Sequence, residues 1–449
     1  MKKHIFLLLL IVITTPVISQ DSDSSDAKKE ISLTEERKRT LRFGIDSEIL
    51  PVLESVSEEK DSAFVEEVEN LFAESFNEKI KIACRVYLKA LVEELGLEDV
   101  LDIISDYENH GTDLVAAVLD YLSSIENEKA LELMKVIVEE KNDGKVLLAA
   151  IRGLSKAGAE DAAELFIEKY KSGDLGTALK AELLLAFGRL KSKETIPLLT
   201  GIVADDVEEP VLRRYACTAL GEIGDPASID VLLDAYSSDD PIFRNYALNA
   251  IGMIEKPETS SILIQALRDD YYKIRITAAE ALGERKVKKA VPILVYKAEK
   301  DPQIAVRTAA AEALGKIGTD EGIAKLKEFA KGERVNLQVR LSAIEVLIEY
   351  QLGKSKQLLK ELILKEWDKQ NSVILERICR VLSFTEAKGL AEMFELMLDH
   401  PTVIVKIHGL RGIRINRIRS LREKVESLAK EGSAASVRKH AASALEALK

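Results

Sequence analysis

Apolar residues recur along this chain at the spacing of one helix face, and small residues mark that face at regular intervals. The pattern Arg-x-x-Ala-x-x-Ala-Leu-Gly begins at Arg213, Arg244, Arg275 and Arg307, with Ile replacing Leu in the second copy. The glycines that close the four copies are 31, 31 and 32 residues apart. A stripe of small residues allows close helix packing, and such a period is typical of a helical solenoid. We therefore predict an array of repeats that bury their apolar faces only against their neighbours.

A second apolar segment follows each copy, for example residues 226–236 and 290–296, and an acidic turn precedes each Arg, as in Asp239-Asp240-Pro241. Acidic residues and Pro favour a helix start, so each repeat is predicted to be a helical hairpin. Glycine adopts the left-handed conformation at the least cost, which favours it just past a helix end. The residues predicted to cap helices in this way are Gly221, Gly252, Gly283 and Gly315.

Weaker copies extend the pattern in both directions once substitutions are allowed. We predict an all-α, right-handed solenoid of stacked hairpins of about 31–35 residues over residues 34–449. Its repeats are clear in residues 177–333 and divergent in residues 34–176 and 334–449.

The segments Leu220-Gly221-Glu222-Ile223-Gly224-Asp225 and Leu314-Gly315-Lys316-Ile317-Gly318 resemble the HEAT-repeat superfamily, especially its short phycobilisome-lyase-like variety. The resemblance implies stacked helical hairpins in which the second helix lines the concave surface. It does not fix a function, because one fold of this kind serves many unrelated tasks.

The N-terminus has the charged, apolar and small-residue regions of a secretory signal peptide over residues 1–19. Residues 20–33 are polar and rich in Ser and Asp, so a flexible linker is expected there. The sequence contains no apolar stretch long enough to suggest a transmembrane segment. We therefore expect an exported bacterial protein that is periplasmic, associated with the cell envelope or secreted.

Charge and cysteine content narrow the classes of function. The net charge of the 449 residues is −12. A nucleic-acid binder needs a dominant basic surface, so nucleic acid is not an expected partner. Of the three cysteines, Cys84, Cys217 and Cys379, the last two fall within repeat helices and are predicted to be buried thiols rather than disulfide partners.

No spacing of His, Cys or Ser matches a metal site, a phosphate-binding loop or a nucleophile motif. The chain is therefore expected to be non-enzymatic, with no catalytic, cofactor-binding or metal-binding residues. The resemblance leaves a lyase or cofactor-handling enzyme as the alternative, although the aromatic content is 5% and the one Trp, Trp367, lies in an irregular repeat. A purely structural spacer of the envelope is the third hypothesis.

The Arg residues that open the pattern would align as a column if the repeats superimpose. They are Arg213, Arg244, Arg275, Arg307, Arg340 and Arg438. Such a column could bind anions. We favour a structural role, in which each Arg pairs with the acidic turn of its own or the adjacent repeat.

Two further positions in each repeat, one residue and five residues after the Arg, lie on a helix face away from the small-residue stripe. These candidates for partner contact on the concave face are Arg214, Thr218, Asn245, Asn249, Ile276, Glu280, Thr308, Glu312, Leu341 and Glu345. Their mixed polarity suits an adaptable groove for another protein, and it equally suits a solvated helix face.

The segment 401–424 is basic within an acidic protein. Its candidate patch comprises Lys406, Arg411, Arg414, Arg417, Arg419 and Arg422. These charges could be solvated or paired within the repeat, or they could dock on an acidic partner or another anionic envelope component. Our leading hypothesis from the sequence is a protein-interaction scaffold of the periplasm or cell envelope that binds its partner along the concave face.

Overall fold

The computed structural model describes residues 23–449 except 93–96, 126, 142–143, 173–174 and 432–433. All regular elements in these residues are helical, which confirms the predicted all-α class. The chain divides into two compact units, Met1–Leu175 and Gly176–Lys449.

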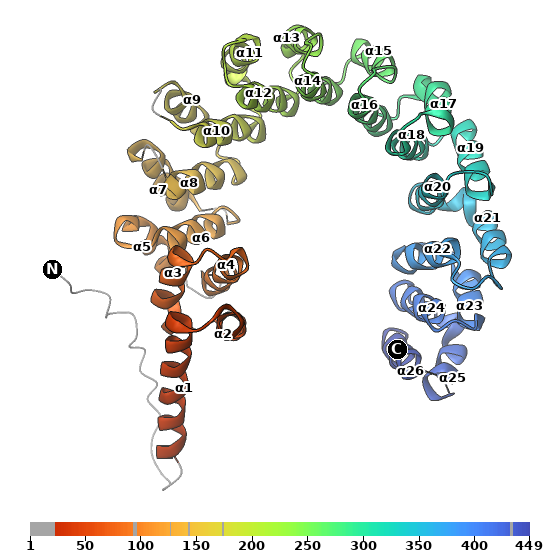
Figure 1. Ribbon diagram of the computed structural model, residues 1–449, viewed down its shortest axis with the longest axis horizontal. Helices are drawn as coiled ribbons and strands as arrows, with labels where there is room; N and C mark the ends of the chain where they lie inside the picture. The colour runs from red at the N-terminus through yellow and green to blue at the C-terminus, as the bar shows by residue number, and fades with distance from the viewer. Residues whose placement is uncertain (1–22, 93–96, 126, 142–143, 173–174, 432–433) are drawn as a thin grey trace. The chain divides into compact units, whose positions relative to one another are not determined.

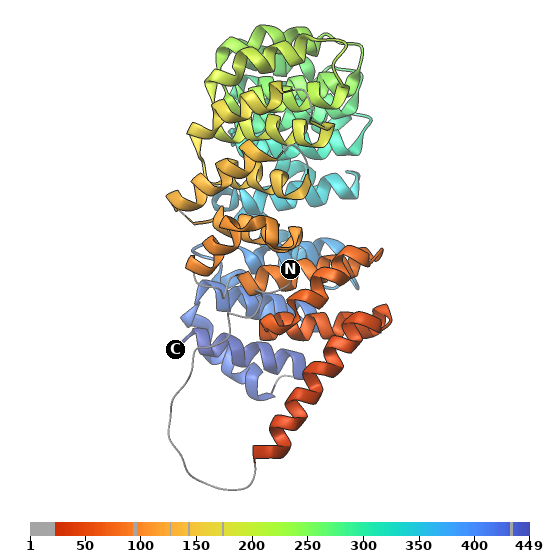
Figure 2. The same cartoon turned by 90° about the vertical axis from the view of Figure 1, so that its left-hand side faces the viewer.

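The first unit begins with one long helix, α1, drawn in red in Figure 2, and continues with shorter helices. Its α-helices are α1 (Asp23–Phe43), α2 (Asp46–Glu59), α3 (Val65–Glu74), α4 (Glu78–Val92), α5 (Leu97–Ser105), α6 (Thr112–Leu122), α7 (Glu128–Glu140), α8 (Gly144–Lys156) and α9 (Ala163–Lys171). Short 3-10 turns lie at η1 (Ser62–Phe64), η2 (Tyr107–Asn109) and η3 (Glu160–Ala162). Helices α2, α4, α6 and α8 pack in one row, and α3, α5 and α7 each pack on the even-numbered helix that follows.

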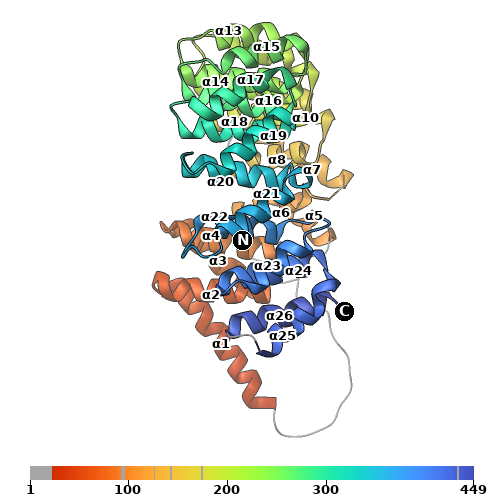
Figure 3. The ribbon, with the colours of Figure 1, turned by 90° about the vertical axis from the view of Figure 1, so that its right-hand side faces the viewer.

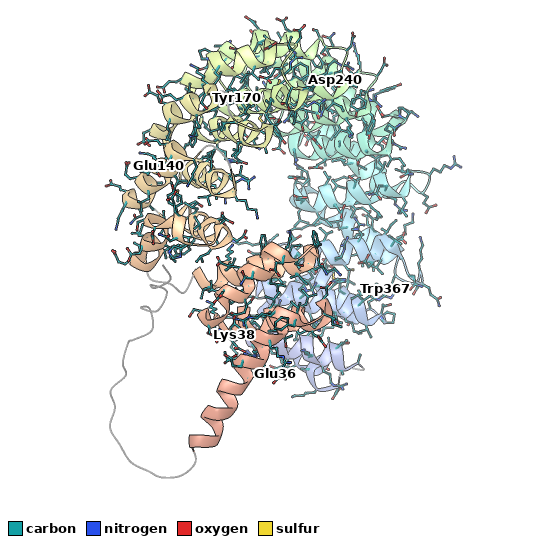
Figure 4. All side chains as sticks on the ribbon, turned by 60° about the vertical axis from the view of Figure 1, so that its left-hand side comes forward. Glu36, Lys38, Glu140, Tyr170, Asp240 and Trp367 are labelled. Carbon is teal, nitrogen blue, oxygen red and sulfur yellow. The ribbon has the colours of Figure 1, made fainter. Side chains whose placement is uncertain are left out.

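Helix α1 packs on α2 and α3, and it meets α3 at the buried side chain of Glu67. The guanidinium of Arg42 lies 2.5 Å from a Glu67 carboxylate oxygen, and the amine of Lys38, labelled in Figure 4, lies 3.5 Å from it. Helix α1 begins at Asp23, within the segment 20–33 for which the sequence predicts a flexible linker, and that linker stays a prediction. Ala27, Lys28, Lys29 and Glu30 are tolerated well in helices, which lets the helix extend into this polar stretch. The predicted signal peptide lies outside the described residues.

The second unit repeats the hairpin eight times after α10. Its α-helices are α10 (Thr177–Leu190), α11 (Ile196–Ala204), α12 (Pro210–Ile223), α13 (Ile229–Tyr236), α14 (Pro241–Met253), α15 (Pro257–Ala266), α16 (Tyr272–Glu284), α17 (Val291–Lys300), α18 (Ile304–Ile317), α19 (Asp320–Lys331), α20 (Leu337–Glu349), α21 (Leu352–Lys365), α22 (Val373–Phe384), α23 (Ala391–Asp399), α24 (Val403–Asn416), α25 (Arg422–Glu431) and α26 (Ala435–Ala447). Its 3-10 turns are η4 (Lys193–Thr195), η5 (Pro226–Ser228), η6 (Lys288–Ala290) and η7 (Arg419–Leu421).

Within the second unit each odd-numbered helix packs on the even-numbered helix that follows, and successive even-numbered helices pack on one another. Figure 1 shows the even-numbered helices on the inner side of this row and the odd-numbered helices on the outer side. Figure 3 shows the last hairpins stacked in the same way. The solenoid of stacked hairpins predicted from the sequence is therefore confirmed.

The glycines of the repeated motif hold the even-numbered helices close together. Gly221 lies inside α12, where a Cβ atom would stand 2.7 Å from the Cα atom of Ala250 in α14. Gly283 of α16 has the same relation to Ala313 of α18, at 2.8 Å. The prediction that these glycines and their equivalents, Gly252 and Gly315, cap the helices is wrong, because each lies within a helix that continues beyond it.

Two of the helix caps lie three residues further along the chain. Gly224 and Gly318 follow α12 and α18 with φ angles of 71° and 72°, in the left-handed region. The N–H of Gly224 donates to the carbonyl of Leu220, which closes the last turn. One glycine of each Leu-Gly-x-Ile-Gly segment therefore permits close packing, and the other ends the helix.

One pair of neighbouring even-numbered helices, α20 and α22, packs less extensively than the other pairs of the second unit. In the register of the repeats, Ile348 of α20 takes the position of Gly221, and Val381 of α22 takes the position of Ala250. Ile348 is 1% exposed. Two branched side chains replace a glycine and an alanine at this interface, so the helix backbones cannot approach as closely.

The Arg column is part of the packing between repeats. The guanidinium of Arg213 donates to the carbonyl of Val203, near the end of the preceding outer helix, at 2.9 and 3.1 Å. Arg307 and Arg340 donate in the same way to the carbonyls that end α17 and α19, those of Ala298 and Ala330. Cations are favoured at helix C-termini, where carbonyls lack partners. These three arginines thus fasten the two helices of their own hairpins.

Arg244, Arg275 and Arg340 reach acidic side chains of the following repeat, which confirms the predicted pairing for these three members of the column. Arg275 makes two hydrogen bonds to Asp301, of 2.7 and 2.8 Å, and both side chains are buried. Arg244 lies 3.6 Å from Asp269. Burial alone would raise the pKa of Asp301, yet hydrogen bonds from Arg275 and from the backbone N–H of Gln303 hold that pKa below its ordinary value.

All three cysteines are buried thiols, and none forms a disulfide. Loss of hydration raises the pKa of Cys217 and of Cys379 to about 12. The prediction of buried thiols within the repeat helices is confirmed.

Candidate protein-binding face

The inner face of the second unit is the surface of the even-numbered helices that points away from the odd-numbered ones. Of the residues predicted for partner contact, Asn249 and Glu280 are exposed. Seven are half-buried, namely Arg214, Thr218, Asn245, Ile276, Thr308, Glu312 and Glu345. Leu341 is 4% exposed, so it packs within the repeat and offers no contact surface.

Several of these predicted residues also join neighbouring repeats, and one of them is Glu345, which accepts from the guanidinium of Arg377 in α22 at 2.6 Å. Arg214 donates to the carboxylate of Asp240 in the next repeat at 3.1 Å, and Asn245 accepts from the hydroxyl of Thr277 at 2.9 Å. Asp240, labelled in Figure 4, also accepts from the N–H of Ile242 and so caps α14. Some of the residues predicted for partner contact therefore stabilise the packing of repeats. The role of the others in binding stays a prediction.

A row of exposed apolar side chains, missed in the sequence, lies in the first turn of the even-numbered helices. Its members are Val211, Ile242, Ile304, Leu337, Val373 and Ile404, each between 36% and 49% exposed. Ile242 lines a hollow together with Asn245 and Asn249, which places it on the inner face. The signal was visible in the sequence, since first helical turns usually carry polar residues. We call these six residues the apolar row.

An acidic band lies further along the same helices, from α16 to α20. It comprises Glu280, Glu284, Glu312, Glu345 and Glu349. The amine of Lys316 lies 2.7 Å from carboxylate oxygens of both Glu284 and Glu312. Reduced hydration and the nearby charges of Glu312 and Glu284 raise the pKa of Glu280. The band therefore contains repulsion between like charges, which Lys316 and the ion pair of Glu345 with Arg377, at 2.6 Å, only partly relieve.

The structure separates the predicted basic patch into two groups. Lys406 donates to the carbonyl of Leu398 at 2.5 Å, which is the contact of the Arg column. Arg422 bonds Glu426 within its own helix at 2.8 Å. These two cations are engaged inside the repeats because their partners lie on packed helices or one turn away.

The remaining cations of the patch lie on or near the surface. The guanidinium carbon of Arg411 stands 4.7 Å from the ring centre of Phe384, an arrangement that favours cation–π attraction. Arg414 is exposed and donates to the hydroxyl of Ser443 in α26 at 3.3 Å. Arg417 and Arg419 are exposed after the end of α24. Arg411 and Arg414 thus extend the inner face with positive charge.

His400, which follows Asp399, has a structural position at the end of α23. Its Nδ1 accepts from the N–H of Thr402 at 3.1 Å, so its Nε2 carries the proton that is donated to the carbonyl of Trp367 at 3.0 Å. The Trp367 and His400 rings meet edge to face, and Trp367 is labelled in Figure 4. Asp399 pairs with Lys424 at 2.7 Å. Both residues thus contribute to packing between neighbouring elements.

Within the part of the chain that the structure describes, no three His, Cys, Asp or Glu side chains gather as metal ligands. The helices described likewise include none with the length and apolarity needed to cross a bilayer.

The hairpins, the Arg column and the shared inner face define a helical solenoid of HEAT-like repeats. The chain belongs to the family of spirochaete HEAT repeat proteins, whose model matches residues 41–444.

Individual relatives are similar over shorter stretches. Deoxyhypusine hydroxylase of Gallus gallus is 42% identical over 66 residues, which are 15% of this chain and 22% of that protein. The enzyme of the same name from Saccharomyces cerevisiae is 30% identical over 125 residues, which are 25% of this chain and 38% of that protein. The matches therefore span well under half of these relatives.

Two solved structures have similar arrangements of helices. Kap121p matches 95% of this chain and 54% of its own, with a TM-score of 0.43 and 12% identity. The complex of CpcE and CpcF of phycocyanin lyase from Nostoc sp. PCC7120 matches 57% of this chain and 95% of its own, with a TM-score of 0.33 and 21% identity. At these values no partner or activity carries over to this chain.

Proposed function

We propose that this protein is a non-enzymatic scaffold that binds another protein along the inner face of its second unit. The observation that carries the proposal is the apolar row, which presents one exposed aliphatic side chain on each of six helices. Single exposed apolar residues are ordinary, but their repetition along one surface is typical of an interaction site. Polar and charged side chains beside the row give the mixed composition of a protein interface.

The scaffold can be tested by placing a photo-crosslinking amino acid at Asn249, which is exposed on the inner face. The matched control is Tyr296 of the outer helix α17, which is 61% exposed. In the native cell, a discrete adduct is expected from position 249 and none from position 296. Adducts of equal yield from both positions would contradict binding by the inner face, and no adduct from either would favour a structural spacer.

We further propose that the protein is exported to the periplasm or cell envelope. The support is the signal-peptide pattern of residues 1–19. Mass spectrometry of the mature chain should show a new N-terminus near residue 20, and cell fractionation should find the protein outside the cytoplasm. An N-terminus at Met1 would contradict export through this leader.

The alternative function is a lyase or cofactor-handling enzyme. The partial identity with deoxyhypusine hydroxylases is the observation that favours it. Absorbance and metal analysis of the protein purified from its own cells separate the two hypotheses. A stoichiometric pigment or metal would favour the enzyme, whereas the scaffold requires neither.

A further inference from the structure

The interface between α20 and α22 contains an open groove on the inner face. It is lined by Glu345, Glu349, Arg380, Val381, Phe384 and Thr385 and has a volume of about 470 Å³. The groove lies where Ile348 and Val381 replace the small residues that close other interfaces. Its position thus follows from the sequence of this one repeat.

Phe384 is the most unusual residue of the groove, because this aromatic side chain is 62% exposed. Arg411 of the next even-numbered helix stands over its ring at 4.7 Å. Aromatic and Arg side chains dominate the binding energy of many interfaces. Phe384 and Arg411 therefore form a surface that an apolar side chain of a partner could cover.

The groove also marks a change in the sign of charge along the inner face. The acidic band occupies α16 to α20 on one side of it. Arg411 and Arg414 of α24 lie on the other side, and the partner that the structure gives Arg414 is the neutral hydroxyl of Ser443. An occupant that spans the groove therefore meets negative charge at one end and positive charge at the other.

We propose that this groove binds a protein segment whose apolar anchor residue lies between a basic cluster and an acidic cluster. The anchor covers Phe384, the basic cluster faces Glu280 and Glu349, and the acidic cluster faces Arg411 and Arg414. An anionic lipid or polymer fits less well, since the acidic band would repel it. This inference rests on the proposed scaffold function and specifies the chemistry of its partner.

The test begins with selection of short random peptides, displayed on phage, against the immobilised full chain. The selected sequences should carry an apolar residue between Lys or Arg on one side and Asp or Glu on the other. Peptides made from them are then titrated against Phe384→Ser, with Tyr296→Ser as the control of matched exposure. We expect the dissociation constant to rise about tenfold or more for the first variant and to stay unchanged for the second.

Charge reversal tests the orientation of the segment. The paired variant Glu280→Lys/Glu349→Lys should weaken the selected peptide and favour a version whose basic residues are replaced by Glu. The variant Arg411→Glu/Arg414→Glu should weaken binding of the selected peptide by repelling its acidic cluster. Thermal unfolding verifies that each variant is folded. Enrichment of peptides without the charge pattern, no enrichment, or equal binding by Phe384→Ser would overturn the inference.

The result can be told apart from a failure of the scaffold itself. If position 249 still yields its adduct when Phe384 is Ser, and no peptide of the stated pattern binds, then the scaffold function stands and the groove proposal fails. If position 249 yields no adduct in the native protein, the scaffold function fails.

Discussion

The α12–α14 and α20–α22 interfaces occupy equivalent places in the repeat, yet they pack differently. At the first, Gly221 lets the backbone of α14 approach so closely that a Cβ atom would stand 2.7 Å from Ala250. At the second, Ile348 and Val381 take the corresponding positions, and a groove opens on the inner face. The comparison shows how the small residues of the motif determine the distance between helices, while a local exception to them makes a surface available for binding.

The largest expected effect concerns the charge pair that fastens the regular repeats. Replacing Arg275 with Met leaves the buried carboxylate of Asp301 without its main partner, and the free energy of unfolding should fall by about 3–5 kcal/mol. Arg268→Met, at an exposed site, is the control. Denaturant unfolding measures both, and hydrogen exchange should locate the loss at α16 and α18. Equal stability of the two variants would show that the pair of Arg275 and Asp301 does not stabilise this interface.

Truncation of the large residue at the open interface should also destabilise the chain. Ile348→Ala should cost about 3 kcal/mol, because a buried aliphatic side chain is removed and the surroundings relax only in part. Faster hydrogen exchange is expected in α20 and α22. If the helices instead close together without loss of stability, Ile348 is the spacer that keeps them apart, and its packing contributes little.

A smaller loss of stability is expected at the α12–α14 interface, from a substitution that would stabilise most helices. Gly221→Ala should lower stability by about 1–2 kcal/mol, although Ala is the better helix former by about 1 kcal/mol, because its Cβ atom would press on the backbone of α14. Gly201→Ala in α11 is the matched control, since no atom stands within 4 Å of its new Cβ. That variant should be more stable than the native protein. Thermal unfolding of the two variants decides, and stabilisation by both would argue against close packing at Gly221.

The smallest expected effect is a loss of folding stability at acidic pH. The pKa of Asp301 is held below its ordinary value, as described above, and so is that of Glu366. Burial would raise the pKa of Glu366, but hydrogen bonds from Lys369 and Ser372 and the charge of Arg340 lower it. A carboxylate with a lowered folded-state pKa stabilises the fold above its unfolded pKa of about 4 and loses that contribution as the pH falls through the folded value.

Unfolding temperatures between neutral and strongly acidic pH test this expectation. Asp301→Asn should reduce the acid sensitivity that α16 and α18 show in hydrogen exchange, and Glu366→Gln should do the same for α20 and α22. A pH profile that neither substitution alters would assign the acid sensitivity to other carboxylates.

The periodic features were predictable from the sequence, because periodicity translates directly into helix faces. The hairpins, the small-residue stripe and the structural role of Arg275 all follow from residues that recur in register. The prediction of the helix ends was wrong, since the helix passes through Leu-Gly and runs on to Gly224. Both glycines of that segment were visible, but their conformations depend on how closely the next helix approaches.

Features that depend on packing could not be predicted. Ile242 and Ile304 could be placed in first helical turns from the sequence, but only the arrangement of neighbouring helices shows that they are exposed. The partner of Lys406 is a carbonyl on another helix, which no local charge pattern reveals. Phe384 acquires significance only because α20 stands apart from α22. The inner helix face was thus predictable in outline, its contacts required the structure, and its role in binding stays a proposal.

The bond between Arg275 and Asp301 also bears on how such a chain can lengthen. The repeat that contains α16 accepts an Arg from the unit before it, since Asp269 pairs with Arg244, and offers one to the unit after it, since Arg275 pairs with Asp301. A tandem duplication of one such unit would therefore add an Arg that can pair with the next unit and an Asp that can pair with the preceding one. Copy number can then change in a single genetic event without leaving a buried charge unmatched.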